Sequence, residues 1–72
     1  MGLAEVVAQI TGTIWRIECE VGQEVDEGDA LVIIESMKME LPVEAESPGV
    51  VREIRCREGQ SVGEGDTLVV LE

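Results

Sequence analysis

The sequence predicts an all-β domain in which two related sheets pack face to face as a flattened barrel. The chain repeats itself, because residues 12–35 align with residues 49–72 at a constant offset of 37, and 12 of the 24 aligned positions are identical. Its apolar residues are chiefly Val, Ile and Leu, and β-branched residues favour strands over helices. No segment shows the 3.6-residue period of an amphipathic helix, so short strands linked by turns indicate a sandwich or barrel.

The duplication indicates one domain with approximate two-fold symmetry. Its half-repeats span about residues 6–35 and 43–72, and a chain of 72 residues leaves no room for a second core. Two copies are too few for a solenoid. We therefore expect residues 1–72 to form a single unit, which opens with a strand over residues 3–9.

A strand expected over residues 12–19 carries a break in its alternation. Its apolar residues Ile14 and Ile17 lie three positions apart rather than two, and the second half repeats this step at Val51 and Ile54. An extra residue in one strand of a pair, which forms a β-bulge, produces such a shift. We therefore expect a bulge at the same place in both halves.

Glycine-containing turns separate the remaining strands. The pair Gly22-Gln23 and the triplet Glu27-Gly28-Asp29 predict turns, because glycine adopts positive φ at no steric cost. Residues 30–36 and 67–72 are then strands. Pro42 restricts its own strand to a sheet edge or a bulge, because proline lacks the amide that a central strand needs.

The charge balance excludes several classes of partner. The chain holds 16 acidic and 5 basic residues, for a net charge of −11 at pH 7. Nucleic-acid binding and attraction to an anionic membrane both need a basic face, so neither partner is expected. We expect a soluble monomer whose partners present basic surfaces. The longest apolar run, residues 30–34, is too short to span a bilayer.

The cysteines bear on the cellular compartment. Cys19 and Cys56 occupy equivalent positions of the two halves, where small apolar side chains fit. We expect both in the core, since a reducing compartment disfavours a disulfide and no Cys-x-x-Cys pair or histidine supports a zinc site.

No charged and then apolar leader opens the chain, so the expected location is the cytoplasm. Trp15, whose counterpart is Arg52, is open to either a core or a contact role.

Lys38 is the only lysine of the chain, and it lies in the stretch ESMKME at residues 35–40, between the two half-repeats. Strands that end at Ser36 and start near Glu40 leave room for a hairpin turn at residues 37–39, with the amine at an exposed tip. An amine acts as a nucleophile where the guanidinium of arginine does not. The flanking methionines suit an adaptable contact surface. The pattern predicts a site of covalent attachment, and the alternative is an ordinary solvated lysine.

The stretch Glu-Ser-Met-Lys-Met at residues 35–39 resembles the Glu-Ala/Ser-Met-Lys-Met signature of biotin carboxyl carrier domains. The likeness covers essentially the whole chain, including the glycines that open each half and the Glu-Gly-Asp turns. It implies a flattened barrel of two four-stranded antiparallel sheets, with Lys38 on a hairpin turn. It also implies biotin in amide linkage to Lys38, added by a biotin protein ligase. The residues that it places in recognition around this lysine are Glu35, Ser36, Met37, Met39 and Glu40.

The same resemblance implies the function. A biotin carboxylase carboxylates the attached biotin, and a swinging arm carries the carboxybiotin to a carboxyltransferase, for example in an acyl-CoA carboxylase. The chain is then a non-catalytic carrier subunit or domain, and the sequence offers no histidine or metal-ligand set for acid–base chemistry. Residues 21–29 equal residues 58–66 in length, so the chain resembles the small carriers that lack the thumb insertion of some bacterial acetyl-CoA carboxylases.

Two alternatives to a biotin carrier remain. Lipoyl domains are similar in fold, but their signature generally has Asp before the lysine and a small residue or Val after it, whereas Met stands at both places here. Lipoate on Lys38, instead of biotin or in addition to it, is therefore the first alternative. An unmodified β-barrel adaptor is the second, although such a protein has no need of Met-Lys-Met.

Overall fold

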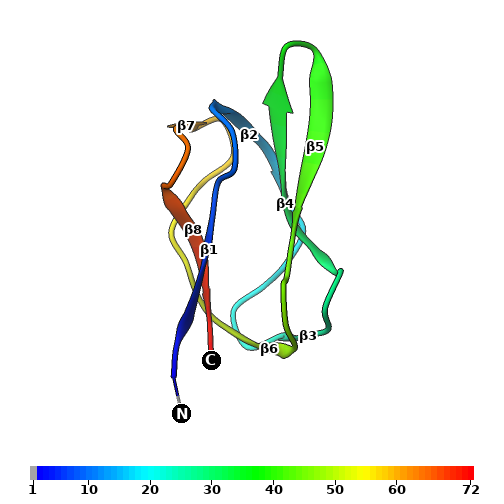
Figure 1. The fold of residues 1–72 in the computed structure, drawn as a ribbon, viewed down its shortest axis with the longest axis vertical. Helices are drawn as coiled ribbons and strands as arrows, with labels where there is room; N and C mark the ends of the chain where they lie inside the picture. Colours follow the sequence, from blue (N-terminus) through cyan, green and yellow to red (C-terminus); the bar gives the residue numbers. More distant parts are fainter. Residues whose placement is uncertain (1) are drawn as a thin grey trace.

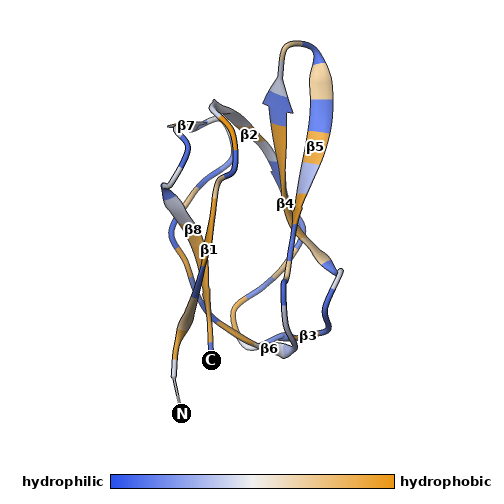
Figure 2. Cartoon of the chain, in the orientation of Figure 1, coloured by the Kyte–Doolittle hydropathy of each residue, from blue (hydrophilic) through white to orange (hydrophobic). Residues whose placement is uncertain are grey.

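The computed structural model describes residues 2–72, which form eight short strands joined by turns (Figure 1). Apolar residues concentrate in the strands, and hydrophilic ones in the turns that connect them (Figure 2). No helix within residues 2–72 is long and apolar enough to cross a membrane. The strands are β1 (Ala4–Val7), β2 (Gly12–Ile17), β3 (Glu24–Val25), β4 (Ala30–Ser36), β5 (Met39–Glu44), β6 (Gly49–Ile54), β7 (Ser61–Val62) and β8 (Thr67–Leu71).

The strands form two four-stranded antiparallel sheets, which confirms the predicted fold class. One sheet has the order β1-β8-β6-β3 and the other has the order β5-β4-β2-β7. Exchanging each strand of the first sheet for its counterpart in the other half-repeat, β1 for β5 and β8 for β4, gives the second sheet. The duplication of sequence is therefore a duplication of topology, and each sheet takes strands from both halves.

Both predicted β-bulges are present. The register of β2 against β4 shifts at Trp15, and the register of β6 against β8 shifts at the equivalent residue, Arg52. The bulge leaves Trp15 and Arg16 both exposed, where strict alternation would have sent one of them inward. Pro42 lies in β5, which is an edge strand as predicted.

Three predicted strands are longer than the observed ones, the last by a single residue because β8 ends at Leu71. The first ends at Val7 rather than at residue 9, and the second ends at Ile17 rather than at residue 19. Both of these strands end where a following side chain, Ala8 or Cys19, turns into the core, although the next backbone amide still bonds to the partner side of the sheet. The amide of Ala8, for example, donates to the carbonyl of Asp66 at 2.9 Å, and the Ala8 side chain is buried in the core.

The core lies between the two sheets, and no polar or charged side chain of residues 2–72 is buried in it. Cys19 and Cys56 belong to this core, as predicted, and both are free thiols in this structure. Burial raises the pKa of the Cys19 thiol, and burial followed by the charge on Cys19 raises the pKa of Cys56. The largest fully buried side chains are Ile14, Leu31, Val32, Ile34, Val51, Leu68 and Val69.

The turns repeat between the halves as the strands do. Four turn glycines, two in each half, have φ between 88° and 94°, which side chains rarely adopt. Asp29 and its counterpart Asp66 close the second turn of each half by accepting a hydrogen bond from the backbone amide three residues earlier, at 2.9 and 2.8 Å. The four glycines are Gly22, Gly28, Gly59 and Gly65.

Candidate functional site

The lysine lies at the tip of the hairpin that β4 and β5 form. Ser36 pairs with Met39 across the two strands, so Met37 and Lys38 alone make the turn. The predicted hairpin is confirmed, but the predicted turn over residues 37–39 is one residue too long because Met39 already belongs to β5. Both turn residues have positive φ, 52° for Met37 and 66° for Lys38. Two such residues are the mark of a type I′ turn, whose twist matches that of the flanking strands.

The tip is open to solvent. Met37 is 90% exposed, Met39 is 56% exposed, and Lys38 is also exposed. Methionine side chains at this exposure add little to the core, whereas flexible thioethers suit contact with another protein. Their part in recognition around the lysine stays a prediction.

Two carboxylates flank the tip without holding the amine. Glu35 and Glu40 are directly opposite each other, in the pair next to the one that closes the turn, and both are exposed. Like charges in this arrangement weaken a strand pair. Both ion pairs found among residues 2–72 involve arginines in or just after β6, so neither glutamate bonds to Lys38. The residues predicted for the site, 35–40, therefore form one continuous hairpin end with an exposed amine.

Close approach of β2 fixes the base of the hairpin. A Cβ placed on Gly12 would lie 2.5 Å from the carbonyl oxygen of Glu35 and 2.6 Å from Cγ2 of Ile34, so glycine is required there. Ile34 is itself fully buried. In the sequence Gly12 marks only the start of a half-repeat, because this approach depends on the pairing of strands that lie far apart in the chain. The hairpin projects from the end of the molecule opposite both chain termini (Figure 1).

Among the residues that the structure describes, no second candidate centre lies beside the lysine. A groove of about 740 Å³ opens between the edge strands β1 and β5, but no residue from 35 to 40 lines it. No group of three or more potential metal-ligating side chains occurs in the part of the chain that the structure describes. The site is a primary amine on a projecting hairpin, and the active site of another protein could enclose it.

Three comparisons relate the chain to known proteins. The model of a family described as biotin-requiring enzyme matches residues 2–71. Over 41 residues, the chain is 39% identical to the biotin/lipoyl attachment protein of Bacillus subtilis (strain 168), covering 57% of this chain and 56% of that protein. It is 42% identical over 41 residues to the biotinylated protein TB7.3 of Mycobacterium tuberculosis (strain ATCC 25618 / H37Rv), covering 57% of this chain and 58% of that protein. The matched stretch thus spans little more than half of each relative.

A solved structure extends the likeness to the whole chain. The crystal structure of the urea carboxylase of Kluyveromyces lactis matches with a TM-score of 0.94 and 33% sequence identity. The match covers 100% of this chain and 6% of that one. One small part of that large protein therefore has the fold described above.

Proposed function

The chain belongs to the family of biotin-requiring enzymes, and we propose that it serves there as a biotin carboxyl carrier that receives biotin on Lys38. The observation that carries this proposal is the position of Lys38, which is the only lysine of the chain and forms a two-residue turn with Met37. The hairpin fits covalent attachment, because the exposed amine has no ion-pair or hydrogen-bond partner among residues 2–72 that the modification would have to displace.

Attachment is an acyl transfer to Nζ of Lys38. The deprotonated amine attacks the carbonyl carbon of biotin that a biotin protein ligase holds as an acyl-adenylate. A C–N bond forms, the bond from that carbon to the phosphate oxygen breaks, AMP leaves, and the amine proton passes to a base. Glu35 and Glu40 flank the turn but neither bonds to the amine, so the ligase supplies the deprotonation.

After attachment, the role of this chain is to position and to tether. Biotin supplies a ureido nitrogen that carries a carboxyl group from a biotin carboxylase to a carboxyltransferase. The lysine stem and the biotin tail form a flexible arm, and the β4–β5 hairpin is the rigid base on which it turns. Tethering raises the effective concentration of the carried group at each active site, because the group is never released into solution. The carrier itself performs no chemical step after it is loaded.

Lipoate on Lys38 is the second candidate. It is favoured by the likeness to a relative named biotin/lipoyl attachment protein. Methionine on both sides of Lys38 favours biotin. Offering the protein biotin with its ligase and lipoate with its ligase, in separate reactions, distinguishes the two.

The free thiols of Cys19 and Cys56 are compatible with a reducing compartment, which supports action in the cytoplasm.

Carboxyl transfer is the test of the carrier function. The biotinylated protein is incubated with a purified bacterial biotin carboxylase, MgATP and radiolabelled bicarbonate, and label on the protein is counted after rapid gel filtration. We expect label on the biotinylated protein and none on Lys38→Arg treated in parallel. Biotinylated protein that takes up no label, or equal label on the variant, would overturn the carrier function.

A further inference from the structure

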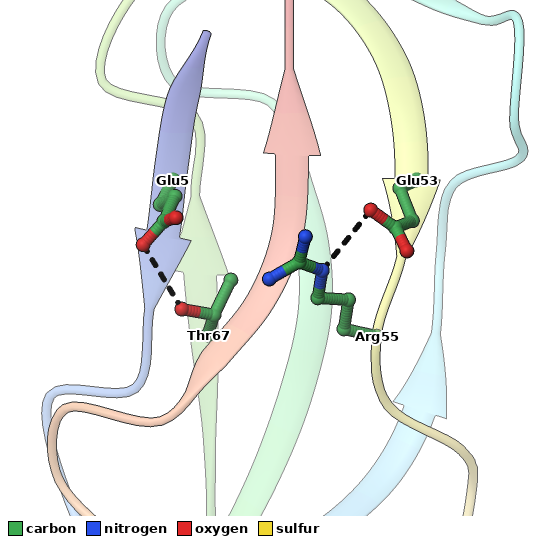
Figure 3. Close-up of polar contacts among 4 residues, drawn as sticks. All are labelled: Glu5, Glu53, Arg55 and Thr67. Carbon is green, nitrogen blue, oxygen red and sulfur yellow. Dashed lines mark hydrogen bonds and ion pairs between the residues drawn. The ribbon is translucent and has the colours of Figure 1, made fainter.

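Because of the internal duplication, the outer faces of the two sheets can be compared residue by residue. On the outer face of the β1-β8-β6-β3 sheet, charged and polar side chains hold one another (Figure 3). Arg55 binds Glu53 at 3.0 Å, and the hydroxyl of Thr67 donates to Glu5 at 3.1 Å. Val70, in the middle strand between them, is only 3% exposed. This face is closed by its own side chains.

An ion pair between Arg52 and Glu72, at 3.0 Å, completes the closed face. The other sheet cannot form the equivalent ion pair, because one of the two residues is different there. Subtracting the offset of 37 converts Glu72 to Glu35 and Arg52 to Trp15. Glu35 therefore keeps its carboxylate but has lost the arginine that neutralises its counterpart. Trp15 is 42% exposed, and the guanidinium carbon of its neighbour Arg16 lies over its ring, 4.7 Å from the centroid.

The rest of this outer face, on the β5-β4-β2-β7 sheet, also lacks polar side chains that cover the other sheet. Pro42 stands where the other sheet has Glu5, and Ala30 stands where it has Thr67. Ile33 is paired with both Pro42 and Arg16, so the side chains of all three lie on one face. Ile33 is partly exposed, whereas its counterpart Val70 is buried. We call this surface, defined by Trp15, Ile33, Glu35 and Pro42, the hairpin face.

The hairpin face is within reach of the lysine. Ile33 precedes Lys38 by five residues on the same strand and turn, which is at most about 16 Å at about 3.3 Å per residue. A standard interface buries about 800 Å² on each partner, which corresponds to a disc about 30 Å across. A partner that encloses the amine and extends along β4 as far as Ile33 reaches the part of β2 that holds Trp15, while the closed face lies on the other sheet.

We propose that the hairpin face is the docking surface of the ligase that acylates Lys38, an inference that rests on the proposed function. The ligase has to bring Nζ itself to the acyl-adenylate, so it must hold the body of the domain close to the hairpin. Enzymes that act later meet biotin at the far end of the arm and have no such need. The chemistry of the face defines the partner surface: an apolar recess for Trp15, with basic groups opposite Glu35 and Glu40.

Variants that exchange counterpart residues test this surface. Trp15→Arg installs the residue of the equivalent bulge, where arginine is accommodated and pairs with a glutamate, so the fold should tolerate it. Pro42→Glu installs the counterpart Glu5 and gives an independent second variant. Arg52→Trp is the matched control, because it places a new tryptophan on the closed face. Thermal melts report folding, and kcat and KM are measured with a purified bacterial biotin protein ligase.

We expect Trp15→Arg to raise the KM for the carrier about tenfold or more with kcat within about twofold, as for a buried aromatic anchor. Pro42→Glu should raise KM in the same way, and Trp15→Phe should recover most of the loss. Arg52→Trp should stay within about twofold of the wild type. Unchanged KM in both Trp15→Arg and Pro42→Glu, or equal impairment by Arg52→Trp, would overturn the docking surface alone. A folded wild-type domain that receives no biotin would instead overturn the proposed function.

Discussion

Met37 and Lys38 stand side by side in the left-handed region of backbone space, with φ of 52° and 66°. Two-residue hairpin turns of this kind usually contain Asn-Gly, because most side chains are disfavoured at positive φ. The left-handed conformation costs about 1–2 kcal/mol for each L-residue. The hairpin therefore carries two side chains that its backbone does not favour, which agrees with a tip selected for what it presents.

Relief of this cost is the first prediction. Met37→Asn should raise the free energy of unfolding by about 0.5–1 kcal/mol, because asparagine tolerates positive φ far better than methionine. Urea unfolding measures the change. Met39→Asn is the matched control, since residue 39 lies in β5 with ordinary strand geometry and should show no gain. A loss of stability in Met37→Asn would show that the turn is not strained.

The second prediction separates recognition from stability at the two methionines. Because Met37 is 90% exposed and Met39 is 56% exposed, changing both to leucine should alter the melting temperature little. The same change should slow biotinylation, because branched leucine lacks the flexibility of the thioether. Melts and ligase kinetics on one protein preparation measure both effects. A loss of about 2–5 kcal/mol in Met37→Ala, as for buried methionines, would contradict the exposed tip.

The buried thiols give the third prediction, a loss of stability in alkali. Burial raises the pKa of Cys19 and Cys56 above the ordinary value of 9.0. At pH values above 9.0 the unfolded chain therefore releases these protons before the folded chain does, and unfolding becomes more favourable as pH rises. Urea unfolding from about pH 8 to about pH 10 measures the slope. The double variant Cys19→Val with Cys56→Val should flatten it, and an equal slope in that variant would assign the effect to other groups.

The fourth prediction concerns encounter between the carrier and its ligase. The net charge of −11 becomes −12 when Lys38 loses its charge on acylation, so basic partner surfaces should be attracted at every stage. Biotinylation at sub-saturating carrier should slow as salt shortens the Debye length from about 10 Å at 0.1 M to about 3 Å at 1 M. The rate on a neutral lysine peptide corrects for salt effects on the ligase. A corrected rate that stays flat would assign the acidity to solubility alone.

Much of the fold was predictable because the duplication states each feature twice. The three-residue step from Ile14 to Ile17 predicted a bulge. The same step recurs at Val51 and Ile54, which strengthened the prediction. The cysteines were placed in the core for the same reason. Pro42 was placed at an edge by the missing amide alone.

The errors and omissions have physical causes. The predicted length of the hairpin turn was wrong because Met and Lys are not residue types that indicate positive φ. A two-residue turn, in which both residues have positive φ, was therefore not predicted. The requirement for Gly12 arises from contact with Glu35, a residue on another strand. Whether Trp15 is exposed depends on which face of the sheet its side chain occupies at the β-bulge. The residue types alone do not determine that face.

The intact mass of the protein after reaction with biotin, ATP and a biotin protein ligase tests the central claim most directly. The account predicts the mass of one added biotinyl group on the wild type and none on Lys38→Arg. It also predicts none on Lys38→Arg combined with Arg52→Lys, which keeps one exposed lysine but moves it from the hairpin to β6. Biotin on either variant would show that any accessible amine suffices and would contradict Lys38 as the attachment site.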